Sequence, residues 1–383
     1  MKLYFDYNST TPICQEAKSK MNELLNESSF HNSSSVHSYG RKAKLMLEEA
    51  RIDLLKSFNA SKYDLAFVAS GTEANNLILD NFKEDSIFIS QIEHLSIYRH
   101  IEYKNNIKTI RVNREGILDL DHLDNLLKTA CSSNNLENNS NNNSRRFLVS
   151  VMMANNETGV IQPMKEILDI VRRYGAFLHS DCAQVIGKIN LDFDDMDLDF
   201  ASISGHKFGG PTGSGALLYK KEHKLTPLII GGGQEKGLRS GTENLFSIVG
   251  MAAAAASIKS NYLDHASNIG KLRDLIEEKI KSICPDVKIP SRDVSRLANT
   301  SVLIMPAVNN QLQLVRMDLN NISVSSGSAC SSGKTYGSHV LKAMNYNEEE
   351  IYNAIRISLG PLNKVKDVEI FCKVWENIYT HQK

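Results

Sequence analysis

A lysine that follows an apolar stretch is the residue whose surroundings point most directly to chemistry. Lys207 comes after the apolar segment 200–203 and stands between His206 and two glycines in the run SGHKFGG. A lysine held in such a turn can form a Schiff base with the carbonyl group of a cofactor. A single loop lysine is more often simply solvated, so other motifs must decide between these interpretations.

A possible phosphate site is formed by Ser70-Gly71-Thr72-Glu73, where a short apolar strand runs into a helix. Free backbone N–H groups and the helix dipole favour an anion at such a helix start. The same order of residues is also typical of an ordinary helix cap. The motif therefore allows a phosphate without requiring one.

Polar side chains also follow three other expected strands. Asp181 comes after the strand at 176–179, with Gln184 three residues on, and this carboxylate either caps a turn or pairs with a protonated ring nitrogen. His94 follows the strand at 87–89 and Asn156 the strand at 147–151. Ligands of α/β sheets bind at the carboxyl ends of strands, although a histidine there is as often a cap or a half-buried core residue.

Cys330 lies among small polar residues in the run SSGSACSSGKT, whereas Cys182 has the apolar surroundings of a structural cysteine. We expect Cys330 to be an exposed thiol that travels to its substrate, activated from elsewhere in the fold because only Lys334 lies near it in sequence. The same run resembles a phosphate-binding P-loop, but five residues separate its glycines where four are needed.

Several classes of site are excluded by spacing. The six cysteines stand at 14, 131, 182, 284, 330 and 372, so there is no C-x-x-C pair for zinc, a redox disulfide or a closely spaced cluster. The sequence contains no H-E-x-x-H, G-x-S-x-G or dinucleotide-binding G-x-G-x-x-G motif. No metal site is expected.

These motifs require a sheet to bring them together. Strand-like and helix-like segments alternate, which favours an α/β fold with a largely parallel sheet. Apolar residues at 43, 47, 50, 54 and 58 predict an amphipathic helix. Further helices are expected at 119–130, 165–174, 244–260, 265–283, 311–319 and up to 379, and further strands at 65–68, 107–112, 200–203, 301–305, 322–325 and 355–359.

The chain divides into two expected domains and one insertion. Residues 15–260 form a large domain, and residues 1–14 with 261–383 form a smaller α+β domain that carries the cysteine. Seven of the ten residues at 134–143 are Asn, so the segment 132–145 is expected to be a solvated surface insertion.

Charge and hydropathy limit the possible partners. The 383 residues include 44 basic and 44 acidic ones, a balance that argues against a broad nucleic-acid or membrane surface. No signal peptide and no apolar run of about 18 residues is visible. We expect a cytoplasmic protein without direct contact to nucleic acid or membrane.

Taken together, the strand-end motifs resemble those of the class V aminotransferase family of pyridoxal-phosphate enzymes. They are specifically similar to cysteine desulfurases of the NifS/IscS type, and they occur in that family's order over nearly the whole chain. The motifs are YFDYNSTTP at 4–12, SGTE at 70–73, EH at 93–94, NNETG at 155–159, HSDCAQ at 179–184, SGHK at 204–207, RSGT at 239–242, SSGSAC at 325–330 and IRISLG at 355–360.

The resemblance implies a fold-type-I architecture and a role for each matching residue. Lys207 would hold pyridoxal 5'-phosphate as a Schiff base, and Asp181 would pair with its ring nitrogen. His94 would stack on the ring and shuttle a proton, with Cys330 as the nucleophile and Arg356 as the clamp for the substrate carboxylate. The remaining cofactor contacts would come from Asn156 and Gln184 near the phenolic oxygen, from Gly71, Thr72, Ser204 and His206 at the phosphate, and from Thr242 of the second subunit of a homodimer.

The implied reaction removes sulfur from L-cysteine, giving L-alanine and a persulfide on Cys330. The sulfur would then pass to an acceptor such as an iron–sulfur scaffold protein or to a thiolation pathway. Two alternatives are another class V enzyme, either an aminotransferase or a selenocysteine/cysteine lyase, and a catalytically silent partner-binding homologue. The sequence identifies neither the acceptor nor any activating partner.

Overall fold

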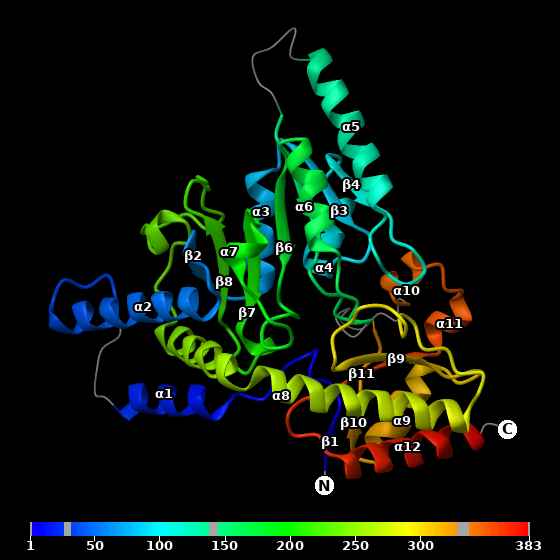
Figure 1. The fold of residues 1–383 in the computed structure, drawn as a ribbon. Helices are drawn as coiled ribbons and strands as arrows, with labels where there is room; N and C mark the ends of the chain where they lie inside the picture. The colour runs from blue at the N-terminus through cyan, green and yellow to red at the C-terminus, as the bar shows by residue number, and fades with distance from the viewer. Residues whose placement is uncertain (1, 27–31, 138–144, 328–336, 382–383) are drawn as a thin grey trace.

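The structure is a computed structural model of the chain. It describes residues 2–26, 32–137, 145–327 and 337–381. Within these ranges, no helix combines the length and apolarity needed to cross a bilayer. Figure 1 shows a central sheet, helices on both of its faces, and a second group of strands and helices beside it. Both chain ends lie in that second group.

The central sheet has seven strands in the order β2-β8-β7-β6-β5-β3-β4. Strand β8 is antiparallel to both neighbours, and the other pairings are parallel, as the alternation of elements predicts. The strands are β2 (Tyr63–Val68), β3 (Ser86–Ser90), β4 (Ile107–Ile110), β5 (Phe147–Ser150), β6 (Phe177–Asp181), β7 (Phe200–Ser204) and β8 (Gly215–Lys220). The sequence pattern had not indicated β8.

Helices cover the sheet on both faces, and neighbouring strand residues alternate between the two cores. Phe147 and Val149 face the larger core, whereas Leu148 between them faces the core under α3. The helices along this part of the chain are α1 (Gln15–Asn26), α2 (Ser38–Ser57), α3 (Gly71–Asn81), α4 (Leu95–Tyr98), α5 (Leu120–Glu137), α6 (Met164–Arg173) and α7 (Phe193–Met196), with short 3-10 turns η1 (Arg99–Glu102), η2 (Gly205–Lys207) and η3 (Glu235–Gly237).

A separate core joins the two ends of the chain. The N-terminal β1 pairs with β10, and Phe5 packs against Phe371 of the last helix, with ring centroids 5.2 Å apart. The elements along these parts of the chain are β1 (Leu3–Tyr4), β9 (Thr300–Ile304), α9 (Asn310–Leu319), β10 (Ile322–Ser323), α10 (His339–Ala343), α11 (Glu348–Tyr352), β11 (Ala354–Ser358) and α12 (Val365–Thr380). Of these, α10 and α11 pack into the larger core instead. The domain limits expected from the sequence stay a prediction.

The predicted pair of helices at 244–260 and 265–283 was wrong, because one helix, α8 (Leu245–Ile283), spans both. It packs against α1 and α2 near its start and against α12 near its end, so tertiary contacts support it on both sides of residue 260. Helix α5 also extends beyond its predicted end at 130, to Glu137. Of the expected Asn-rich insertion, residues 138–144 lie outside the described ranges.

Candidate functional site

The predicted site residues gather at one edge of the sheet because their strands end there. Strands β3, β5, β6 and β7 are parallel, and β2 runs in the same direction because β8 is antiparallel to both β2 and β7. The ends of these strands and the segments after them carry Gly71, His94, Asn156, Asp181 and Lys207. Parallel topology thus brings five distant parts of the chain to a common crevice.

The Asp181 carboxylate is buried and held at both oxygens. The side-chain amide of Asn75, on α3, donates to its Oδ2 at 2.8 Å, and the Ala183 N–H donates to its Oδ1 at 2.9 Å. A carboxylate fixed in this way can orient a cationic N–H partner such as a protonated ring nitrogen. Asn75 was not identified from the sequence, although it belongs to the helix that begins at Gly71.

His94 is half-buried at the N-terminus of α4. Its Nδ1 accepts the Ser96 N–H at 3.2 Å and lies 2.8 Å from the Ser96 hydroxyl oxygen. The histidine is therefore both the helix cap that the sequence allowed and a residue of the crevice. Capping fixes the ring through Nδ1 and leaves its opposite edge to face other groups.

Lys207 is held by the N-terminal segment. Its Nζ donates to the carbonyl oxygens of Asn8 at 2.7 Å and Ser9 at 2.9 Å. Gln184 donates to the same Asn8 carbonyl at 3.0 Å, so Asn8 connects the lysine to the loop after β6. Nothing local in the sequence marks Asn8, whose partners stand 148 to 350 residues away along the chain.

A second lysine lies behind this group. Lys188 Nζ donates to Asn8 Oδ1 at 2.8 Å and to Gln184 Oε1 at 2.6 Å. Burial, together with the charges of Lys207 and Arg356, lowers the pKa of Lys188 well below its ordinary value. Lys188 was missed because its only local signal is its position four residues after Gln184.

The start of α3 is shaped to admit an anion. The Ser70 side chain caps the helix by accepting the Glu73 N–H at 3.2 Å, while the Gly71 and Thr72 N–H groups have no hydrogen-bond partner in the described part of the chain. A Cβ added at Gly71 would stand 3.3 Å from the Ser204 Cβ, so a side chain there would crowd the site. These two N–H groups and the Ser204 hydroxyl form a donor set suited to phosphate.

His206 lies beside this donor set. Its Nδ1 stands 3.2 Å from the Thr10 hydroxyl. Burial and the neighbouring Lys207 charge lower the pKa of His206 to about 4, so its ring is neutral at pH 7. Together with Lys207 and Asp181, the donors at this edge fit a cofactor that carries a carbonyl, a ring nitrogen and a phosphate.

Arg356, on β11, brings a buried cation to the crevice. Its Nη1 donates to the Asn156 carbonyl at 3.0 Å, and its Nη2 donates to Asp6 Oδ1 at 2.6 Å and to Ser9 Oγ at 2.8 Å. Its Nε is buried without a hydrogen-bond partner among the described residues. An unsatisfied guanidinium N–H has a strong preference for a carboxylate.

Glu157, missed in the sequence, lies next to this clamp and at the base of the segment that carries Cys330. The Ser338 hydroxyl donates to its carboxylate at 2.5 Å, and Gly327 lies so close to Glu157 that it leaves no room for a side chain. Burial raises the pKa of Glu157 to about 7, although Ser338 and Arg356 oppose the rise. Cys330 itself falls within 328–336, outside the described residues.

Thr242 is exposed on the loop between η3 and α8, and its contribution to a second subunit stays a prediction.

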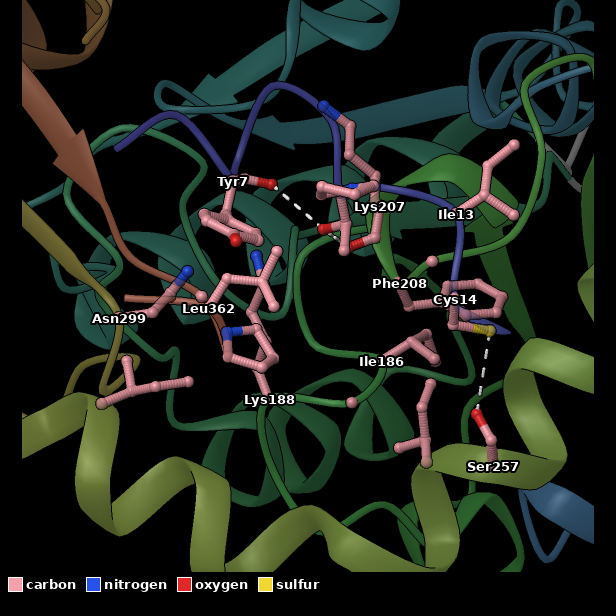
Figure 2. A pocket seen from close by; sticks show the side chains of 18 of the residues that line it. Tyr7, Ile13, Cys14, Ile186, Lys188, Lys207, Phe208, Ser257, Asn299 and Leu362 are labelled. Carbon is pink, nitrogen blue, oxygen red and sulfur yellow. Dashed lines mark hydrogen bonds between the residues drawn. The ribbon is translucent and has the colours of Figure 1, made fainter. Parts of the chain in front are cut away.

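A cavity of about 500 Å³ borders Lys207 and Lys188 near Cys14 and Leu362 (Figure 2). Among the expected cofactor ligands in the described ranges, only Lys207 lines this cavity.

The family model for class V aminotransferases matches residues 3–371. The chain is 33% identical to the cysteine desulfurase IscS of Dictyoglomus turgidum, covering 98% of this chain and 94% of that protein. It is 36% identical to the cysteine desulfurase IscS of Ehrlichia chaffeensis, covering 94% and 87% respectively. The structure is similar to a NifS-like protein from Rickettsia africae, with a TM-score of 0.90, 43% identity and coverage of 99% and 100%.

Proposed function

The chain belongs to the class V aminotransferase family, whose members depend on pyridoxal phosphate, and we propose that it is a cysteine desulfurase. Relatives that carry this name match almost the entire chain. The structural observation that supports the proposal best is the position of Glu157. It contacts Gly327 and Ser338, the two flanks of the Cys330 segment, directly beside the Arg356 clamp.

Each residue of the crevice has a separate role in the proposed reaction. Arg356 binds the carboxylate of L-cysteine through its fork of N–H groups. Lys207 takes the Cα proton and His94 moves a proton to and from the substrate. Asp181 would hold the ring nitrogen of the cofactor and the donors at the start of α3 its phosphate, and Asn156 and Gln184 would contact its phenolic oxygen. When bound, pyridoxal phosphate supplies an electron sink for the negative charge that develops at Cα.

Sulfur transfer is the step that belongs to Cys330. Its thiolate attacks the substrate sulfur, a sulfur–sulfur bond forms and the carbon–sulfur bond breaks. The electrons of the broken bond stay with the carbon skeleton, which takes up a proton in place of the sulfur. The products are L-alanine and a persulfide on Cys330, from which an acceptor collects the sulfur.

We also propose that the chain acts as a homodimer in the cytoplasm. Exposed apolar side chains occur on α2 and on the loop before η3, among them Tyr39, Leu45 and Ile230, the last with 86% of its surface exposed. The buried Arg51–Glu235 ion pair connects α2 to η3, which follows this loop. Apolar surface of this kind is typical of a subunit interface, and it would bring Thr242 toward the cofactor phosphate of the second subunit. A scaffold protein for iron–sulfur clusters is the acceptor that we propose.

Mass spectrometry after treatment with L-cysteine tests the proposed reaction. The holoenzyme should gain the mass of one sulfur atom on the peptide that contains Cys330. Cys330→Ala should release no sulfide while it keeps the absorbance of bound cofactor. The matched control Cys14→Ala removes a partly exposed thiol elsewhere in the chain and should behave like the parent. Sulfide release at the parent rate by Cys330→Ala would refute the proposal.

A further inference from the structure

A continuous chain of hydrogen bonds connects His94 to Asp181 at the back of the crevice. The Asn75 amide nitrogen lies 2.8 Å from Asp181 Oδ2 and also 2.8 Å from the Ser96 hydroxyl oxygen. That hydroxyl lies 2.8 Å from His94 Nδ1, to which the Ser96 backbone N–H also donates at 3.2 Å. Two residues without an expected role, Asn75 and Ser96, therefore stand between two residues that have one.

The chemistry of these groups fixes the direction of each hydrogen bond. An ionised carboxylate only accepts, so one N–H of Asn75 points to Asp181 and the other points to the Ser96 oxygen. The Ser96 hydroxyl, which accepts from Asn75, is free to turn its own hydrogen to His94 Nδ1. Because the Ser96 backbone N–H can only donate, His94 Nδ1 must offer a lone pair.

A neutral histidine whose Nδ1 accepts carries its proton on Nε2. We propose that Asn75 and Ser96 are positioning residues that hold His94 in this tautomer and at the same time orient the Asp181 carboxylate. The inference rests on the proposed roles of His94 and Asp181 in the desulfurase reaction. It assigns Nε2 as the atom of His94 that delivers a proton.

The burial of Asn75 agrees with this role. Its side chain is 1% exposed, and its amide oxygen is buried without a hydrogen-bond partner among the described residues. Leaving such an acceptor unsatisfied costs about 1–3 kcal/mol. An apolar residue would avoid that cost but would supply neither N–H donor, so the two donors are what this position provides.

Nitrogen NMR of cofactor-free protein labelled at histidine tests the tautomer without any dependence on turnover. We expect the neutral ring of His94 in the parent to show an unprotonated Nδ1 and a protonated Nε2. Ser96→Ala and Asn75→Ala should raise the fraction of the opposite tautomer, because only the Ser96 backbone N–H then supports acceptance by His94 Nδ1. Ser96→Thr, which restores the hydroxyl, should return the parent signal. The matched control Asn76→Ala lies on the same helix outside the hydrogen-bond chain and should leave the signal unchanged.

Kinetics of the loaded enzyme supplies the second readout. Ser96→Ala should lower kcat about tenfold with little change in KM, because proton delivery and not substrate binding is affected. A protonated Nδ1 in the parent, or a tautomer that both Ala variants leave unchanged, would overturn the inference. Absence of a persulfide on Cys330, in contrast, would refute the proposed reaction and leave the tautomer result standing.

Discussion

Replacing Glu157 with Gln should change how the stability of the protein depends on pH. The carboxylate is 3% exposed, contacts the Ser338 hydroxyl and lies near the positive charges of Arg356 and His94. Burial outweighs these favourable contacts and raises the pKa of Glu157 from 4.5 to about 7. The folded protein therefore holds a proton on Glu157 at pH values where the unfolded chain has lost it.

The sign and size of the effect follow from this difference. A group whose pKa is raised by folding contributes its full stability below the unfolded pKa, and the contribution is lost as pH rises through the folded pKa. A rise from 4.5 to about 7 corresponds to about 3 kcal/mol in total. About 2.5 kcal/mol of this should disappear between pH 5 and pH 8. Glu157→Gln removes the titrating group and should remove that loss.

Urea unfolding of the parent and of Glu157→Gln at a series of pH values between 5 and 8 measures the difference. As pH rises from 5 to 8, the free energy of unfolding of the variant should increase relative to that of the parent by about 2.5 kcal/mol. Glu222→Gln makes the same change of charge at an exposed position and serves as the matched control. Parallel pH profiles for Glu157→Gln and the parent would show that burial does not raise the pKa of Glu157.

Three further variants test other parts of the structure. Arg51→Met leaves the Glu235 carboxylate buried and unpaired, and chemical denaturation should show a loss of about 3–5 kcal/mol. Gly71→Ala places a methyl group 3.3 Å from the Ser204 Cβ, and fluorescence titration should show cofactor affinity about tenfold weaker. Arg356→Lys loses the bidentate fork, and steady-state kinetics should show KM for L-cysteine about 100-fold higher with the cofactor absorbance unchanged; an unchanged KM would place the substrate carboxylate elsewhere.

Local sequence patterns were sufficient for much of the fold and for the residues at the strand ends. Alternating apolar segments predicted the parallel strands. Asp181 is the last residue of β6, and Lys207 lies in the turn after β7. Such residues are visible because the turn that presents them is encoded beside them in the chain. The errors concern α8, predicted as two helices, and β8, which was not predicted, because contacts with distant helices and strands stabilise these elements.

The sequence by itself determined which chemical groups the site contains and at which ends of which strands they stand. Only the tertiary structure decided how these groups are held. The Asn8 carbonyl accepts from Lys207, and Asn75 and Ser96 connect Asp181 to His94. Glu157 contacts the residues that flank the Cys330 segment. The physical reason is that these supporting contacts, apart from the local one between Ser96 and His94, join residues remote in sequence. A hydrogen bond between Asn75 and Asp181 spans 106 positions, and it exists only because parallel strands bring their ends together.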